Sequence, residues 1–171
     1  MLSAIGNIRD VKVVVAIANR AVEEEEVLEE LLSILVNGIT REQYIASWIL
    51  SRVVEIEPDI LNESAHNACL KIIHTTKEGG IKRNLIRVWQ FSMPESEAIR
   101  LEILDLAFKL LSDTAQDVAV RVFAITVLEK LLRHFPEIKE EVLFLLEREY
   151  PQATPSFKVR ADRFIKSAGK L

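Results

Sequence analysis

The sequence predicts an all-α protein, an α-solenoid of about nine helices in antiparallel pairs. Apolar residues recur with helical spacing from end to end, and almost no stretch alternates as a strand would. Glycine and proline are scarce, at five each in 171 residues, which is too few for a loop-rich all-β domain. The helices also repeat in pairs with a period of roughly 39 residues, the property of helical-repeat proteins.

Nine helices are expected, and prolines mark three of their starts, where a missing N–H group costs nothing. The expected ranges are roughly 2–20, 23–36, 41–57, 58–76, 80–91, 94–112, 116–134, 136–149 and 155–168. The three prolines are Pro58, Pro136 and Pro155. Asn37-Gly38 is expected to close the second helix in the left-handed conformation. Thr40 then offers an N-cap, with Gln43 completing a capping box.

The repeat is visible as columns of apolar residues. The tetrapeptides "EPDI" at 57–60 and "FPEI" at 135–138 are 78 residues apart, and Ile99 lies midway between Ile60 and Ile138. Further columns follow at the same step: Ala65, Leu104 and Leu143; Ala68, Ala107 and Leu146; and Ile72, Leu111 and Tyr150. Within each helix these positions form one stripe, so they are predicted to be buried.

The alternate helices carry a basic column. Arg83, Arg121 and Arg160 are spaced by 38 and 39 residues. The stretch "DVAVRVFAITVL" at 117–128 has the aspartate and Val-Arg pair found in the first helix of a HEAT-type repeat. The period and this pattern favour a HEAT-like solenoid over the alternative, a plain helical bundle.

Composition bounds the class of protein. With 49% hydrophobic residues, residues 1–171 are expected to form a single domain. The net charge of −4 gives no general reason to expect nucleic-acid binding. The one cysteine, Cys69, excludes an intramolecular disulfide and suits a reducing cytosol. The apolar run Val11–Ala18 is too short to cross a membrane, so a soluble cytoplasmic protein is expected.

The stretch "SMPE" at 92–95 raises the question of catalysis, because Ser-Met-Pro occurs in the signature loop of the fumarase and adenylosuccinate lyase superfamily, where a serine is the general base. Here the preceding glycine, the spacer residue and the following Lys and Asn of that signature are absent. Ser92 is instead expected to cap the next helix, with Glu95 returning to its backbone N–H group. No catalytic residue is assigned.

The chain resembles a family of small bacterial HEAT-like proteins of unassigned function, some of which carry the name adenylosuccinate lyase. The resemblance covers roughly residues 10–168 and rests on "YIASWIL" at 44–50, Arg83 and Arg121, "LFLLEREYP" at 143–151 and "FKVR" at 157–160. Members of that family look basic at the position of Ile45, so the arginine column is interrupted here. The resemblance implies the architecture and brings no active site.

Other candidate side chains have structural interpretations. His66, Cys69 and His74 share a helix, but a soft-metal site needs about four converging ligands. Cys69 is expected to pack in the core and His66 to face the polar side, so no metal or cofactor is assigned. Trp48 and Trp89 align with aliphatic residues in other repeats and are expected to fill the core; one edge of them, or Tyr44, could contribute to a partner surface.

The predicted function is a non-enzymatic scaffold that binds an unidentified protein, because solenoids expose extended surfaces without a catalytic centre. The candidate interaction surface is basic: Lys82, Arg83, Arg87, Arg121 and Arg160. One alternative is nucleic-acid binding through a basic groove, as in HEAT-like alkylpurine glycosylases. The other is adenylosuccinate lyase activity. The oligomeric state does not follow from the sequence.

Arg121 also has a structural interpretation. In HEAT-type repeats the basic residue after valine can bind an acidic side chain or loop carbonyls of the neighbouring unit. Asp117 precedes Arg121 by one turn and Asp113 lies in the preceding loop, so both are expected partners. A paired, half-buried arginine is expected to stabilise the fold.

Overall fold

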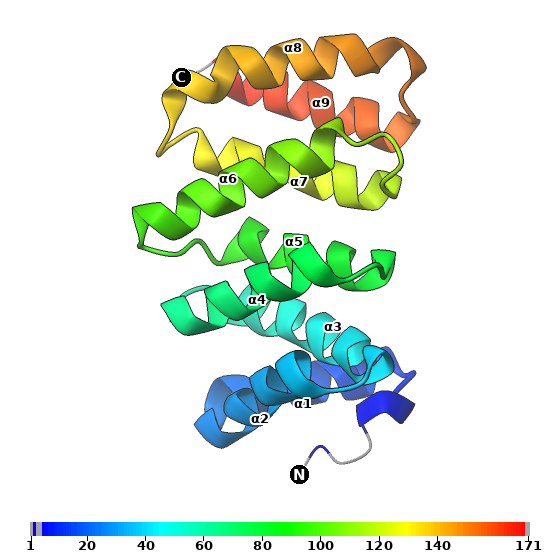
Figure 1. The fold of residues 1–171 in the computed structure, drawn as a ribbon, viewed down its shortest axis with the longest axis vertical. Coiled ribbons are helices and arrows are strands. Elements are labelled where there is room, and N and C mark those ends of the chain that lie inside the picture. The colour runs from blue at the N-terminus through cyan, green and yellow to red at the C-terminus, as the bar shows by residue number, and fades with distance from the viewer. Residues whose placement is uncertain (1, 3–4, 170–171) are drawn as a thin grey trace. The chain divides into compact units, whose positions relative to one another are not determined.

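The prediction of an all-α, HEAT-like α-solenoid is confirmed: the part of the chain described here contains no strand and forms nine α-helices (Figure 1). The computed structural model describes Leu2 and residues 5–169. The α-helices are α1 (Val11–Glu23), α2 (Glu25–Asn37), α3 (Thr40–Ile56), α4 (Glu63–Thr75), α5 (Gly79–Phe91), α6 (Glu97–Ser112), α7 (Val118–Leu131), α8 (Lys139–Glu149) and α9 (Pro155–Ala168). Three 3-10 helices accompany them: η1 (Ile5–Asn7), η2 (Pro136–Ile138) and η3 (Tyr150–Gln152).

The chain divides into two compact units, residues 1–99 and 100–171. In the first unit, α3 packs between α1 and α5, while α2 packs against α4 (Figure 1). Helices α1 and α2 form one antiparallel hairpin, and α4 and α5 form another. The unit is therefore two layers of helices, α1–α3–α5 and α2–α4, with the core between them.

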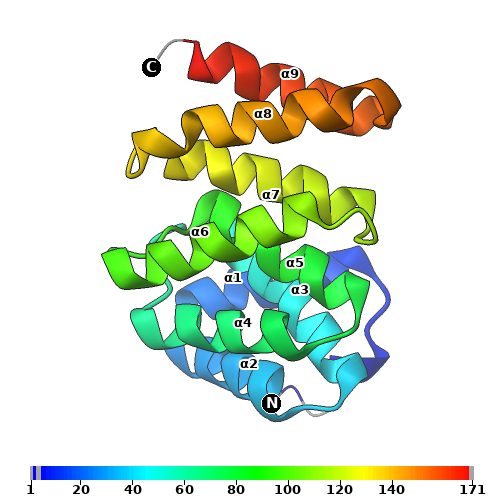
Figure 2. The same cartoon turned by 45° about the horizontal axis from the view of Figure 1, so that its top comes forward.

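In the second unit, α9 packs against both α7 and α8, and Figure 2 shows α8 and α9 running side by side. Phe157 and Phe164 of α9 are fully or almost fully buried, so aromatic rings fill this core. The predicted single domain over residues 1–171 stays a prediction.

The repeat columns lie where the period predicts. Ile99 and Ile138 are buried, as are Leu104, Ala107 and Leu146. The remaining members are buried or half-buried, and none is exposed. The columns therefore form the apolar stripes of the helices that their spacing indicates.

The first helix begins later than predicted. Asp10 caps α1, because its Oδ1 accepts a hydrogen bond from the Lys12 N–H group at 2.8 Å. Residues 5–7 before it form the separate helix η1, so a single helix from residue 2 is wrong. Part of that predicted range, residues 3–4, lies outside the described residues. The aspartate satisfies a backbone donor that would otherwise have no partner, which fixes the start.

The boundary between α2 and α3 also differs from the prediction. Gly38 has a φ of −71°, so the expected left-handed ending is wrong. The residue before α3 is Ile39, whose N–H group donates to Glu42 Oε2 at 3.0 Å; Thr40 is the first helical residue rather than the cap. Gln43 turns away and donates to the Leu35 carbonyl at 3.0 Å. Glu42, rather than Gln43, binds the N–H group before α3 because its negative charge is also favourable in the first turn of a helix.

Proline predicts only some of the helix starts. Pro155 opens α9 behind Thr154, whose Oγ1 accepts from the Phe157 N–H group, as expected. Pro136 opens η2, one turn before α8. The prediction for Pro58 is wrong, because α4 begins at Glu63 after its cap Asn62, whose Oδ1 accepts from the Ala65 N–H group at 2.9 Å.

The predicted cap at Ser92 is wrong as well. Ser92 ends α5, since its N–H group donates to the Val88 carbonyl at 2.9 Å. Helix α6 begins only at Glu97, and Ser96 Oγ accepts from the Ile99 N–H group. Proline disfavours a helical conformation at the residue before it, so Met93 cannot start the helix and the second serine serves as the cap.

Candidate functional site

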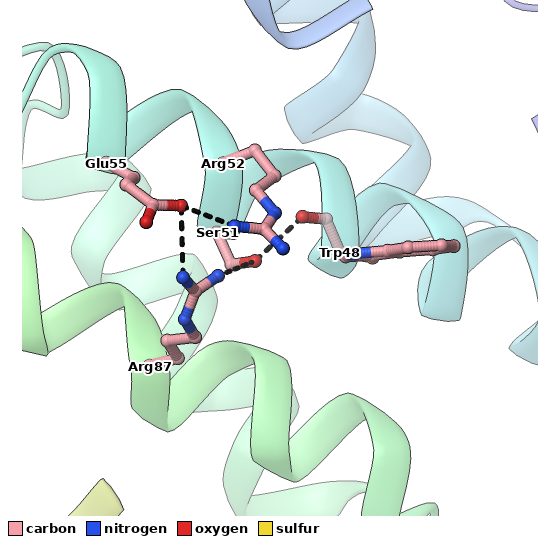
Figure 3. A network of polar contacts seen from close by, with 5 residues as sticks. All are labelled: Trp48, Ser51, Arg52, Glu55 and Arg87. Atoms are coloured by element: carbon pink, nitrogen blue, oxygen red, sulfur yellow. Dashed lines mark hydrogen bonds and ion pairs between the residues drawn. The ribbon is translucent and has the colours of Figure 1, made fainter. Parts of the chain in front are cut away.

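The best-defined polar network on the surface of the first unit joins α3 to α5 (Figure 3). Arg87 of α5 reaches across to α3, where Nη2 lies 3.0 Å from Glu55 Oε2 and Nη1 donates to Ser51 Oγ at 3.4 Å. Arg52 of α3 binds the same Glu55 oxygen at 2.7 Å. One carboxylate oxygen therefore holds two guanidinium groups in place.

The Glu55 carboxyl group has a lowered pKa, which favours its ionised form. Burial alone would raise the pKa of Glu55, but hydrogen bonds and charges from Arg52 and Arg87 outweigh it and lower the pKa. The network stays ionised at neutral pH. It also carries one uncompensated positive charge, since two guanidinium groups share one carboxylate.

Aromatic side chains lie on the same stripe of α3. Tyr44 and Trp48 are half-buried, with ring centroids 6.4 Å apart. The Tyr44 ring lies against Gly80 at the start of α5, where an added Cβ would come within 2.6 Å of Tyr44 Cε2. Glycine is thus needed at this position for the close approach of the two helices. Trp48, predicted as core, is only half-buried, whereas Trp89 is fully buried as expected.

On α5 the corresponding stripe is Arg83, Arg87 and Phe91, four residues apart. Arg83 and Phe91 are exposed, and the Arg87 guanidinium lies 5.3 Å from the centre of the Phe91 ring. The two stripes adjoin, because Tyr44 contacts Gly80 and Arg87 reaches Glu55. We call this surface the α3–α5 face; its residues are Tyr44, Trp48, Arg52, Arg83, Arg87 and Phe91.

In the second unit, Arg121 of α7 contacts the end of α6, Glu149 of α8 and Phe157 of α9. Its Nε donates to the Leu111 carbonyl at 3.0 Å, which is at the end of α6, and its Nη2 lies 3.0 Å from Glu149 Oε2. The guanidinium also stacks on Phe157 of α9, 5.1 Å from the ring centre. The expected kind of interaction is present, but the expected partners, Asp113 and Asp117, are wrong.

Arg160 follows the same pattern. It forms an ion pair with Glu129 of α7, and its side chain is only 14% exposed. Burial and the charge of Arg163 lower its pKa from the usual value. Arg121 and Arg160 therefore lie on neighbouring helices of the second unit, each matched to its own carboxylate.

The five predicted surface residues thus fall into two groups. Lys82, Arg83 and Arg87 lie on α5 in the first unit, whereas Arg121 and Arg160 lie on α7 and α9 in the second. Within the second unit the two arginines are largely buried by their ion pairs. Lys82 is half-buried and Arg83 is exposed, so these two and Arg87 offer the more accessible charge.

His66 and Ser92 line one small cavity in the first unit. His66 is only 2% exposed, so its expected position on the polar side is wrong. The Trp89 indole donates to His66 Nδ1 at 3.2 Å, which leaves the imidazole proton on Nε2. Burial lowers the pKa of His66 to about 4. The imidazole therefore has no free lone pair with which to accept a proton from Ser92.

The fold brings no further metal ligands to Cys69 and His74 among the described residues. Cys69 is fully buried, as expected, and burial raises the pKa of its thiol to about 12. His74 is exposed on the same helix. Among the described residues no three His, Cys, Asp or Glu side chains gather as a metal site would require. None of the helices described is long and apolar enough to cross a membrane.

Sequence reasoning missed Glu55 and the Trp89–His66 hydrogen bond. Glu55 lies 32 residues before Arg87, about two helical turns short of the 39-residue repeat, so a search for opposite charges at the repeat offset would not have found it. Trp89 and His66 are 23 residues apart, an offset unrelated to the repeat, and no local signal joins them.

Of the comparisons with known proteins, the one with protein families gave a match. The sequence model of the HEAT repeat domain matches residues 1–167. Neither the curated proteins nor the solved structures gave a match. The resemblance to bacterial proteins labelled as lyases stays a prediction. With helical hairpins along its length and a family match over almost all of it, the chain belongs to the HEAT repeat family.

Proposed function

We propose that this protein is a non-enzymatic scaffold that binds a partner protein through the α3–α5 face. The observation that supports it is the set of exposed and half-buried aromatic and arginine side chains along α3 and α5. Figure 3 shows Trp48, Arg52 and Arg87 of this set. Tryptophan, tyrosine and arginine are the residue types that contribute most to protein–protein binding energy. Helical-repeat proteins use such extended surfaces for binding.

The rigidity of this surface favours binding. Arg52 and Arg87 are held by Glu55, and Tyr44 by its close fit to Gly80. Side chains ordered before association lose less entropy when a partner docks. The face also carries excess positive charge, from Arg83 and from the second guanidinium bound to Glu55. The partner is therefore expected to present acidic side chains beside an apolar group.

The experiment compares capture of partners by two charge variants. Arg83→Glu reverses an exposed charge on the α3–α5 face, so it should leave the fold unchanged and weaken capture from native lysate. Arg163→Glu, at an exposed position of α9, is the matched control and should capture as wild type does. Equal recovery of the same proteins by both variants would contradict the proposal.

Nucleic-acid binding is the weaker alternative. Arg87, Arg121 and Arg160 each have a carboxylate partner, so much of the candidate basic charge is neutralised within the fold. A groove that binds phosphates would lose affinity steeply as salt rises. Duplex-DNA binding with that salt dependence, lost in Arg83→Glu, would favour this alternative.

Lyase activity has no chemical support at Ser92. His66, which lines the same cavity, accepts from Trp89 at Nδ1 and so carries its proton on Nε2; it has no free lone pair with which to remove the serine proton. A spectroscopic assay for fumarate released from adenylosuccinate decides the matter. We expect no release above the uncatalysed rate.

A further inference from the structure

Helix α1 lies at the edge of the first unit, where it packs against α2 and α3 (Figure 1). Its buried side chains form one stripe: Val14, Ala18 and Ala21. Outside that stripe, Val11 and Val15 lie one turn apart and are 49% and 41% exposed. Val22, which is half-buried, continues the same row two turns further on. Apolar side chains gathered in a row on the surface are typical of an interaction site.

A polar stripe runs along the outer side of α1, beside this row of valines. Its members recur at helical spacing and are all exposed: Lys12, Ala16, Asn19 and Glu23. The Asn19 amide turns back along its own helix and donates to the Val15 carbonyl at 2.9 Å. With Ala16 beside it, no long side chain stands in the middle of the stripe. Its two ends carry opposite charges, Lys12 at the start of α1 and Glu23 at the end.

Neither of these charges is matched within the part of the chain that the structure describes. Arg20 of the same helix pairs with Glu24 at 2.8 Å. Among the described residues, neither Lys12 nor Glu23 takes part in an ion pair. Lys12 also lies in the first turn of α1, where the helix dipole disfavours a cation. A carboxylate from another molecule would offset both effects.

The spacing of the two charges is self-complementary. Lys12 and Glu23 are 11 residues apart, which is about three helical turns, or about 16 Å. Two copies of α1 that pair antiparallel, about a two-fold axis between Ala16 and Asn19, bring Lys12 of each copy against Glu23 of the other. The same axis turns the two rows of valines towards each other. Burial of the valines supplies the attraction, and the two charge pairs select the register.

Other occupants of this surface satisfy the charges less well. A parallel pair of helices would place like charges side by side, Lys12 on Lys12 and Glu23 on Glu23. Nucleic acid or an anionic membrane would be repelled at the end of α1, where Glu23 is followed by three further glutamates, Glu24, Glu25 and Glu26. A second copy of the chain supplies both the row of valines and the opposite charges.

We propose that α1 mediates a homodimer of this protein by antiparallel pairing with α1 of a second copy. Lys12 of each copy pairs with Glu23 of the other, and Val15 packs near the other copy's Val22. One helix from each copy forms the interface, so the buried area is small and the dimer should dissociate at micromolar concentrations.

The test is sedimentation velocity of the full chain at concentrations from micromolar to submillimolar. We expect a reversible equilibrium between monomer and dimer. Lys12→Glu turns two ion pairs into two repulsions and should raise the dissociation constant about ten-fold, and Glu23→Lys should do the same. A wild-type chain that stays monomeric at every concentration would overturn the proposal, as would a dimer that neither substitution weakens.

A mixture of these two variants gives the sharpest result. One variant has a carboxylate at each end of the stripe and the other has an ammonium group at each end, so a heterodimer regains two attractive pairs. We expect the equimolar mixture to sediment as a dimer at concentrations where each variant alone is monomeric. A mixture that stays monomeric there would overturn the pairing of Lys12 with Glu23.

Two control variants locate the interface. Lys71→Glu makes the same charge change at an exposed position of α4 and should dimerise as wild type does. An equal loss of dimer in Lys71→Glu and Lys12→Glu would attribute the effect to net charge and contradict the pairing. Arg83→Glu, which changes the α3–α5 face, should also dimerise normally, so that partner binding and dimer formation can fail separately. Loss of the dimer in Arg83→Glu would contradict the assignment of the interface to α1. Circular dichroism checks the folding of every variant.

Discussion

The two units use arginine in different ways. In the second unit, Arg121 lies under Phe157 and pairs with a Glu149 side chain that is 18% exposed. In the first, Arg87 pairs with Glu55, which is 37% exposed. Each carboxylate also binds a second arginine, so the difference between the two pairs is their burial. The same residue type therefore closes a core in one unit and orders an accessible surface in the other.

The difference follows from what surrounds each carboxylate. Burial alone would raise the pKa of Glu149, but hydrogen bonds from Arg121 and Arg148 and the charges of both lower it. Removing Arg121 from this largely desolvated pair leaves Glu149 with only Arg148, which is half-exposed. Around Glu55 water replaces a lost partner, so the same deletion costs little.

The largest effect is expected for Arg121→Ala. Its loss leaves the Leu111 carbonyl without its donor and Glu149 with only the exposed Arg148, and should lower the free energy of unfolding by about 3–5 kcal/mol. Denaturant unfolding followed by circular dichroism measures it. Arg163→Ala, an exposed arginine two turns from the start of α9, is the control and should unfold at the wild-type midpoint. Coincident unfolding curves for wild type and Arg121→Ala would show that Arg121 does not stabilise the fold. Arg121 would then again be a candidate for partner binding.

The next effect is a pH dependence in the first unit. The folded protein protonates His66 only near pH 4, whereas the unfolded chain does so from about pH 6.5. The contribution of neutral His66 is therefore complete above pH 6.5 and is lost as the pH falls towards 4. The loss should reach about 3 kcal/mol.

Measuring unfolding across that pH range in wild type and His66→Asn isolates this contribution. The asparagine carbonyl can still accept from Trp89 but does not titrate, so the variant should lack this part of the acid destabilisation. Parallel stability profiles for the two proteins would show that His66 is not buried as a neutral acceptor.

Arg87→Ala should have a smaller effect, about 1 kcal/mol or less, because its partner carboxylate is accessible to water. A double-mutant cycle of Arg87→Ala and Glu55→Ala measures the coupling between the two side chains. A coupling as large as that of Arg121 with Glu149 would erase the distinction between the units.

The smallest effect is expected at the start of α6. Ser96→Ala removes the cap and should cost about 0.5–1 kcal/mol, visible as a small shift in the denaturant midpoint. Glu97→Gln, which leaves Ser96 in place, is the comparison within the same turn. If Ser96→Ala has no effect on stability, the start of α6 does not depend on this serine.

The repeat was predictable from sequence because burial recurs with the helices. Ile99, Leu104 and Leu146 lie in the core where a 39-residue period places them. Helix ends were less predictable, since neighbouring groups compete for the same backbone donors. Glu42 replaced Gln43 because its charge favours the first turn, and Ser96 replaced Ser92 because Pro94 disfavours a helical conformation at Met93.

The candidate site was the least predictable part. Arg121 was expected to pair with Asp117, four residues away, but its carboxylate comes from Glu149, 28 residues along the chain. Which acidic residue lies nearest depends on how successive hairpins pack, and a repeat period alone does not specify that. Of the basic column in the sequence, Arg121 and Arg160 therefore form internal ion pairs, and Arg83 on α5 stays exposed.

Site-specific photo-crosslinking tests the central claim most directly. A benzoylphenylalanine at position 91 places the reactive group on the α3–α5 face, and one at position 144, where Phe144 is 64% exposed on α8, places it in the second unit. We predict a partner crosslinked from position 91 and lost when Arg83→Glu is added, with no such product from position 144. The same product from position 144 but not from position 91 would contradict the assignment of binding to the α3–α5 face.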